Sequence, residues 1–184
     1  MLTSGKHCVA AGNGLAGGIA GVASIISVRC RDERNEPRTH GGDVVLVTIA
    51  AQVGPTIDAH VIDNTDGTYT CSYLPVYASP FCKVSVTVNG THLIGSPFDA
   101  SVRPGPTEAR ATEVFGPGLY DGVAGRPNHF TIQTKDTYGN RCSEPGDKFC
   151  VLVRPLHSLI PEFQAFMRRC VRAPSCHAGG APRC

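Results

Sequence analysis

The feature that most constrains this sequence is an internal repeat with a period of 104 residues. When the 184-residue chain is aligned with itself at this offset, 10 of the 38 positions from Gly12 to Ile49 are identical, and no gap is needed. Solenoid repeats have periods of about 20 to 50 residues, so a period of domain length predicts tandem copies of one fold. The agreement ends near residue 153. The matching segments include Gly12-Asn13-Gly14-Leu15 with Gly116-Pro117-Gly118-Leu119, and Gly42-Asp43 with Gly146-Asp147.

The first copy has the pattern of an antiparallel β-sandwich. Apolar and polar residues alternate with a period of two in four segments, which is typical of half-buried strands. The 21 glycines and 14 prolines of the chain supply turns between them. About seven strands in roughly 100 residues is the signature of a two-sheet sandwich. The alternating apolar positions are Ile26, Val28, Cys30; Val45, Val47, Ile49; Tyr69, Cys71, Tyr73; and Cys82, Val84, Val86, Val88.

Composition and charge argue against several classes of function. A net charge of +2 with 17% charged residues produces too little positive electrostatic potential to attract nucleic acid, so we expect no nucleic-acid partner. The uncharged run Cys8–Val28 contains five glycines and is too polar for a membrane span, so we expect no membrane role. No nucleophile elbow, phosphate-binding loop, dinucleotide fingerprint or metalloprotease pair occurs. We therefore expect neither an enzyme nor a cofactor, and we assign no catalytic residue.

Seven short motifs occur in the order and spacing that are typical of one known family. Through these motifs the sequence resembles the filamin-type (actin-binding protein 280) immunoglobulin-like repeat. The resemblance implies an all-β, immunoglobulin-like antiparallel sandwich in tandem copies. It covers a complete repeat at residues 8–103 and the opening of a second at 106–153, which lacks the later motifs. The motifs are Gly12-Asn13-Gly14-Leu15, Ala20-Gly21, Arg31-Asp32, Gly41-Gly42-Asp43, Asp63-Asn64-Thr65-Asp66-Gly67-Thr68-Tyr69, Tyr73-Leu74-Pro75 and Ile94-Gly95-Ser96-Pro97-Phe98.

The resemblance implies a non-catalytic structural spacer and protein-interaction scaffold, and it points to a cytoskeletal setting. Its partners are extended peptide segments and neighbouring repeats, captured by strand addition at the edge between strands C and D. The alternative for this edge is a protected scaffold edge that binds nothing. The helical actin-binding domain of filamins has no counterpart, which argues against direct actin binding. The candidate edge residues are Val44, Val45, Leu46, Val47, Thr48, Ile49, Ala50, Ile57, Val61 and Ile62.

The acidic segment before the third alternating strand is interpreted as a structural turn. Asp63 and Asp66 are expected to accept turn amides, Gly67 to adopt a positive φ, and Tyr69 to place its ring inward. Calcium is excluded, because a calcium-loop register with Asn64 at position three leaves Ile62 at position one. The turn set is Asp63, Asn64, Asp66, Gly67 and Tyr69.

Nine cysteines leave the redox compartment open, because an odd number cannot pair completely within the chain. Cys71 and Cys82 are expected to be free apolar fillers. A bridge from Cys30 to Cys82 is not expected, since they lie at opposite ends of the sandwich. No zinc or other metal site is assigned, because the C-terminal cysteines and histidine lack a paired Cys-x2–4-Cys unit.

The C-terminal segment 154–184 differs in kind, with five arginines against one acidic residue. Apolar positions from Phe163 to Val171 predict a short basic helix, and the abrupt change in composition also fits a truncated or misread gene end. Asn89-Gly90-Thr91 is a glycosylation sequon on a predicted hairpin tip if the chain is secreted. The alternative function is therefore extracellular adhesion, as in the gamete-expressed adhesion proteins that carry filamin-like repeats. The compartment stays open, with a cytoplasmic or cytoskeletal place favoured.

Overall fold

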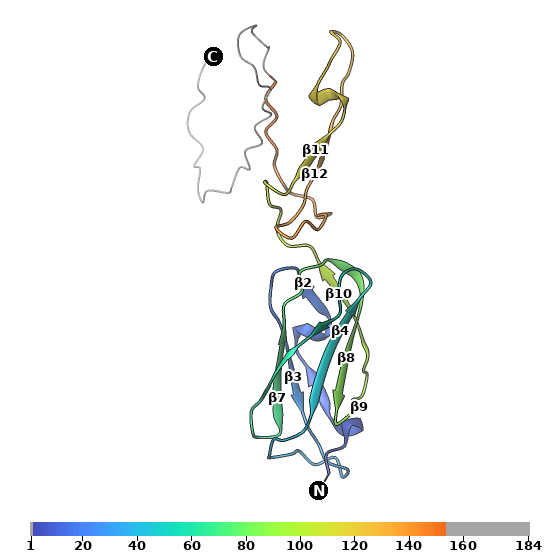
Figure 1. Ribbon diagram of the computed structural model, residues 1–184, viewed down its shortest axis with the longest axis vertical. Helices are drawn as coiled ribbons and strands as arrows, with labels where there is room; N and C mark the ends of the chain where they lie inside the picture. The colour runs from blue at the N-terminus through green and yellow to red at the C-terminus, as the bar shows by residue number, and fades with distance from the viewer. Residues whose placement is uncertain (1, 154–184) are drawn as a thin grey trace. The chain divides into compact units, whose positions relative to one another are not determined.

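The computed structural model describes residues 2–153. The predicted helix and the basic segment 154–184 lie outside these residues. Among the described residues, 2–113 form one compact unit together with Gln133–Ser143, and Val114–Ile132 belong to a second unit with residues 144–153. The first unit is a sandwich of two β-sheets with its strands running along the long direction of that unit (Figure 1). This confirms the predicted all-β, immunoglobulin-like fold class.

One layer of the sandwich is a four-stranded sheet in the order β1-β3-β7-β6. All its neighbouring strands are antiparallel, and the central pair joins Ser24 to Tyr73 and Arg29 to Thr68 without a bulge. The alternation of buried and exposed positions along both central strands follows the sequence pattern. The strands are β1 (Val9–Ala11), β3 (Ser24–Arg29), β6 (His60–Asp63) and β7 (Thr68–Tyr73).

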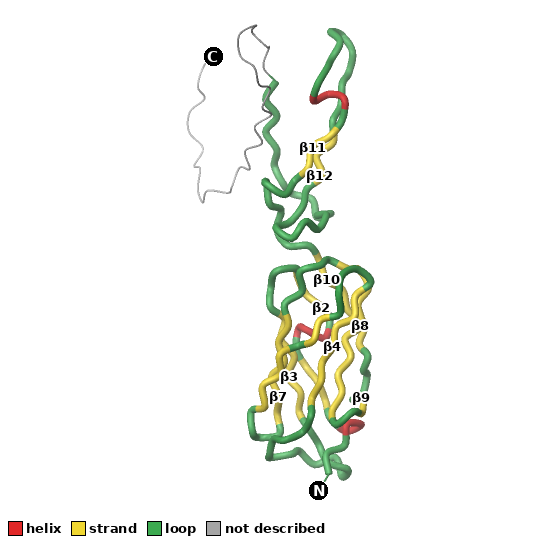
Figure 2. The backbone as a smooth tube through the Cα atoms, in the orientation of Figure 1, coloured by secondary structure: helices red, strands yellow, loops and turns green. Residues whose placement is uncertain are grey.

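The other layer has six strands in the order β2-β10-β8-β4-β5, with β9 also paired to β8. The longest strand, β8, contacts β4 from Val45↔Val88 to Ala51↔Cys82. Strand β2 pairs in parallel with β10, whereas the remaining pairs are antiparallel. The strands, coloured yellow in Figure 2, are β2 (Gly17–Ile19), β4 (Val45–Ala51), β5 (Ile57–Asp58), β8 (Ser79–Val88), β9 (Thr91–His92) and β10 (Phe98–Arg103).

The inward faces of the two sheets enclose one hydrophobic core. Tyr69 is 1% exposed, and the Tyr73 hydroxyl donates to the Gly14 carbonyl at 2.6 Å, so both rings have packed and partnered environments. Two 3-10 turns, η1 (Gly5–His7) and η2 (Asn13–Leu15), flank β1. The predicted alternating positions are all buried: Ile26, Val28, Cys30, Val45, Val47, Ile49, Tyr69, Cys71, Tyr73, Cys82, Val84, Val86 and Val88.

The second copy begins with the same local structure as the first. Strand β11 (Glu113–Phe115) pairs with β12 (Thr131–Gln133), and η3 (Pro117–Leu119) lies between them. Strand β11 lies 104 residues after β1, β12 lies 104 residues after the last three residues of β3, and η3 lies 104 residues after η2. Gly116 has a φ of 132°, against 128° at Gly12, so the described start of the second copy repeats the local backbone of the first.

The described residues contain no counterpart of β4 in the second copy. The 104-residue offset places Phe149 and Val151 at the positions of Val45 and Val47, yet residues 144–153 contain no strand. Phe149 is 45% exposed and Val151 is 54% exposed. In the first copy β4 is held by seven residue pairs to β8, and the described part of the second copy supplies no equivalent of β8. Without that partner the alternating residues have no ladder to join.

Candidate functional site

The backbone of β4 presents one set of peptide groups to β8 and the other set to the outer edge. The Asn89 N–H donates to the Val44 carbonyl at 2.8 Å, and the Gln52 N–H donates to the Phe81 carbonyl at 3.1 Å. Even-numbered positions therefore pair on the β8 side. In an antiparallel ladder the direction alternates residue by residue. The peptide groups of Val45, Val47 and Ile49 therefore face the outer edge.

Part of this outer edge is already paired. Ile49 lies opposite Ile57 of the two-residue strand β5, and the Ala59 N–H donates to the Val47 carbonyl at 2.9 Å. No strand of the described residues pairs with Val45 on that side. The edge is thus open at Val45 and closed at Val47 and Ile49 by a very short segment.

The side chains of the candidate edge divide between the core and the solvent. Val45, Val47 and Ile49 are buried, and Ile57 and Val61 are half-buried and pack against the same core. Ile62 has a 49% exposed side chain, so it does not face inward. The remaining candidates, Val44, Leu46, Thr48 and Ala50, alternate toward the outer face, where Val44 is 60% exposed and Leu46 is 56% exposed.

The turn after β6 connects this edge to the opposite sheet. Oδ2 of Asp63 accepts the Gly42 N–H at 2.8 Å, and its Oδ1 accepts the Thr65 N–H at 2.7 Å. Asp66 Oδ1 accepts the N–H and the hydroxyl of Thr68 at 2.9 and 2.6 Å. These hydrogen bonds hold the turn in place, and the bond to Gly42 ties it to the segment that leads into β4. The hydrogen bonds from Thr68 hold the pKa of Asp66 below its ordinary value.

Two further side chains close the turn. The Asn64 amide donates to the hydroxyls of Thr68 and Thr70 at 3.0 and 3.2 Å. The Tyr69 hydroxyl accepts the Asp43 N–H at 2.9 Å, two residues before Val45. Burial raises the pKa of Tyr69, so the hydroxyl stays protonated at neutral pH. The beginning of the open edge is therefore anchored to the core.

Asn89 of the sequon is exposed at the β8–β9 hairpin but is not a free amide. Its Oδ1 accepts the Val44 N–H at 2.9 Å, and its Nδ2 donates to Asp43 Oδ1 at 2.8 Å. Asn89 and Gly90 both have positive φ, 49° and 77°, which is typical of a two-residue hairpin turn. The side chain of Asn89 thus holds the start of β4 through both of its amide atoms.

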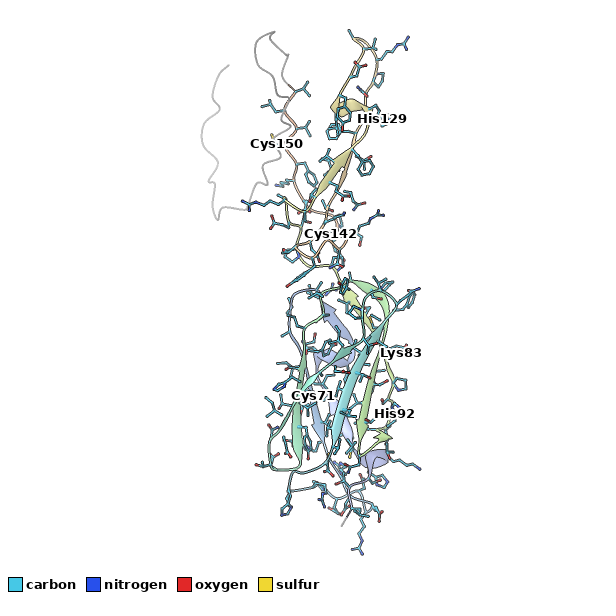
Figure 3. All side chains as sticks on the ribbon, in the orientation of Figure 1. Cys71, Lys83, His92, His129, Cys142 and Cys150 are labelled. Atoms are coloured by element: carbon cyan, nitrogen blue, oxygen red, sulfur yellow. The ribbon has the colours of Figure 1, made fainter. Side chains whose placement is uncertain are left out.

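Sequence reasoning missed a shallow groove on the outer face of the six-stranded sheet. Its volume is about 680 Å³, and it lies beside the 72% exposed ring of Phe81. An exposed ion pair joins Lys83 Nζ to Asp99 Oδ1 at 2.5 Å across it. Figure 3 shows Lys83 and His92 on the side of β8 and β9, whereas Cys71 lies within the strands of the sandwich. Among residues 2–153, no His, Cys, Asp and Glu side chains cluster to hold a metal ion.

Comparison with known families decides what kind of domain this is. The chain matches the sequence profile of the Filamin/ABP280 repeat over residues 3–99. This chain belongs to the filamin repeat family. Filamin repeats are non-enzymatic structural and protein-interaction domains, so the first copy is a protein-interaction module.

The filamin repeat recurs in proteins of different organisation. The chain is 35% identical over 96 residues to the rat E3 ubiquitin-protein ligase TRIM71, covering 52% of this chain and 11% of that protein. It is 36% identical over 97 residues to rat Filamin-C, covering 52% of this chain and 3% of that protein. An Escherichia coli adhesin, FdeC, shares the fold with a TM-score of 0.55 and 16% identity, over 81% of this chain and 46% of that one.

This chain therefore spans only a small part of the length of the curated relatives that it matches. No helix within residues 2–153 is long and apolar enough to cross a membrane.

Proposed function

We propose that the first repeat captures an extended peptide as an added strand along β4, and so acts as a spacer and interaction scaffold. The supporting observation is the row of outward peptide groups at Val45, Val47 and Ile49, covered only in part by the two-residue strand β5. An incompletely paired sheet edge is a template for a further strand.

Peptide pairing begins at the open peptide group of Val45. It continues toward Ile49 as the incoming strand takes the places of Ile57 and Ala59. Strand β5 contributes two register pairs, and isolated short strands are marginally stable, so its displacement is a small cost. Each new backbone hydrogen bond contributes about 0.5–1.5 kcal/mol. The affinity then comes from the main chain, in keeping with strand addition.

Selectivity arises from the half-buried side chains beside the edge. Ile57 and Val61 pack against the core, and displacement of β5 leaves apolar surface next to Val47. The peptide that fits has small apolar side chains at alternate positions, since these replace the lost contact. A charged residue at an inward position is disfavoured because it loses hydration without a partner.

The test uses the full chain and a fluorescent peptide selected from a displayed library of extended, alternating sequences. Val45→Pro removes the outward N–H, whereas Val45→Ala shortens the same side chain and keeps the N–H. Loss of one edge hydrogen bond predicts a roughly two- to tenfold weaker Kd for proline than for alanine. Equal affinities at matched melting temperature would leave the protected-edge alternative standing.

A second variant tests the displacement of β5. Ala59→Pro removes the N–H that pairs with the Val47 carbonyl at 2.9 Å. It is expected to strengthen peptide binding, because it weakens the segment that competes with the peptide. Weaker binding of a folded Ala59→Pro chain contradicts displacement, while still allowing pairing confined to Val45.

A further inference from the structure

Two buried cysteines lie directly across from each other at the beginning of the sandwich. Strand β1 pairs with β3 in the register Val9↔Arg29, and one step further along both chains brings Cys8 opposite Cys30. The Cys30 N–H donates to the Gly67 carbonyl at 2.9 Å, and its carbonyl accepts the Arg38 N–H at 3.0 Å. Both backbone groups of Cys30 therefore face away from β1.

This places the two cysteines in a non-hydrogen-bonded cross-strand position. Residues in such pairs have Cα atoms about 4.5 Å apart and side chains on the same face. Disulfides join Cα atoms separated by roughly 4.4–6.8 Å. A pair in this register has the backbone spacing of a disulfide, so we expect oxidation of Cys8 and Cys30 to require no change of register.

The two thiols also interact with each other. Both residues are 0% exposed. The Sγ of Cys8 donates to the Ser4 carbonyl at 3.2 Å and accepts the Arg31 N–H at 3.4 Å. A hydrogen bond from the Cys30 thiol lowers the pKa of Cys8, and the same contact together with burial raises the pKa of Cys30. The Arg31 N–H that points at Cys8 Sγ stabilises a thiolate there, so we expect Cys8 to act as the nucleophile of the pair.

The second copy carries threonine at the two equivalent positions. Thr112 and Thr134 stand 104 residues after Cys8 and Cys30. The Lys135 N–H donates to Thr112 Oγ1 at 3.5 Å, which parallels the bond from Arg31 to Cys8. A threonine hydroxyl thus makes the same local contact in the described start of the second copy that the Cys8 thiol makes in the first.

We propose that Cys8 and Cys30 are an oxidisable pair that forms an intrachain disulfide with a two-electron oxidant of the peroxide class. The Cys8 thiolate attacks one peroxide oxygen, the O–O bond breaks, and hydroxide leaves and is protonated to water. Cys30 then gives up its proton and attacks the Cys8 sulfenic sulfur, the S–O bond breaks, and a second water leaves. Two thiols and one hydrogen peroxide thus give one disulfide and two waters.

The segment before β1 controls access to the pair. The Ser4 N–H donates to the Arg31 carbonyl at 2.8 Å, and His7 Nδ1 lies 3.0 Å from the Asp32 carbonyl oxygen. Local opening of these contacts exposes the thiols. The disulfide then ties the start of β1 to the end of β3 and restricts the unfolded chain, so the oxidised protein is expected to melt at a higher temperature.

The test treats the full reduced chain with hydrogen peroxide under native conditions, blocks remaining thiols with N-ethylmaleimide, and digests it with trypsin. Cleavage after Lys6, Arg29 and Arg31 releases His7–Arg29 and Cys30-Arg31. The expected product is these two peptides joined by a disulfide, together with a raised melting temperature that dithiothreitol reverses. The exposed Cys150 is expected to react separately and does not enter this product.

The matched control is Cys8→Thr, which copies Thr112 and should keep the native fold. It is expected to lose both the linked peptide and the shift in melting temperature. Linkage that forms only in urea overturns the proposal, since it then reflects the unfolded chain. Over-oxidation of Cys8 to the sulfinic acid without any linked peptide also overturns it, because Cys30 is then not placed to resolve the sulfenic acid.

Discussion

Asp32 and Asp136 lie 104 residues apart and make the same two hydrogen bonds. Oδ1 of each accepts the backbone N–H groups two and four residues further on, and all four distances are 2.9 Å. Asp136 adds a second set, in which its Oδ2 accepts the Gly105 N–H and the Asn140 side-chain amide, both at 2.8 Å. The repeated loop is thus tied, in the second copy, to the chain that leaves β10.

This loop is also bonded to the first sandwich within the same compact unit. The Asn140 amide donates to the Val76 carbonyl at 2.9 Å, and its Oδ1 accepts the Ala78 N–H at 2.9 Å. Asp136 is 1% exposed at the centre of these contacts. We therefore predict that Asp136→Asn increases hydrogen exchange at the Gly105, Tyr138 and Asn140 amides. Unchanged protection at these three amides would contradict the anchoring role.

The same carboxylate predicts a dependence on pH. Burial raises the pKa of Asp136, but the bonds donated by Asn140, Gly105 and Tyr138 outweigh it and hold the pKa below its ordinary value. A lowered pKa means that the contribution to stability is complete above about pH 4 and is lost as pH falls through the folded pKa. The protection factor of the Gly105 amide, which compares its exchange rate with that of the unfolded chain at the same pH, should fall below about pH 4 in the natural chain. In Asp136→Asn this acid-induced loss of protection should be absent.

Local alternation accounts for what the sequence predicted about the site. Val45, Val47 and Ile49 are buried as expected, because a period of two determines which side chains share a face. The resemblance placed Ile57, Val61 and Ile62 at one edge, but the structure divides this segment into β5, which pairs with β4, and β6, which pairs with β7. This division was not predictable, since two residues carry no periodic signal. The cross-strand position of Cys8 and Cys30 depends on register between distant strands, which alternation alone leaves undetermined.

Tyr69 supplies both packing and a hydrogen bond, and its two contributions can be separated. Tyr69→Phe keeps the ring but leaves the Asp43 N–H without its acceptor, which should cost about 1–3 kcal/mol of unfolding free energy. Tyr69→Ala also creates a cavity and should cost about 3–5 kcal/mol. Urea unfolding of the full chain measures both. Equal losses for the two variants would show that the hydroxyl, rather than the ring, carries the effect.

Gly67 and Gly90 both have positive φ, 83° and 77°, but differ in their surroundings. A Cβ on Gly67 would lie 2.1 Å from the Arg38 carbonyl oxygen, whereas a Cβ on Gly90 meets no atom within 4 Å. Gly90→Ala should therefore cost about 1–2 kcal/mol from the backbone conformation alone. Gly67→Ala should cost more, because the neighbouring backbone must also move. A larger loss for Gly90→Ala in the same urea experiment would contradict this order.

The final prediction concerns which part of the chain folds alone. Residues 8–103 contain both sheets and are expected to melt cooperatively. A fragment of residues 2–105 should be more stable, because Ser4 bonds to the Arg31 carbonyl and Gly5 is buried against Thr91. If 2–105 were no more stable than 8–103, the N-terminal contacts would contribute nothing measurable. The segment before β1 would then open more easily over Cys8 than its hydrogen bonds indicate.

Residues 106–153 should not fold alone, since β11 and β12 form only a two-stranded sheet and Tyr120 is 88% exposed. Spectra typical of an unfolded or aggregated chain are expected from this fragment. Dispersed, sharp amide resonances from a soluble 106–153 fragment would contradict the prediction.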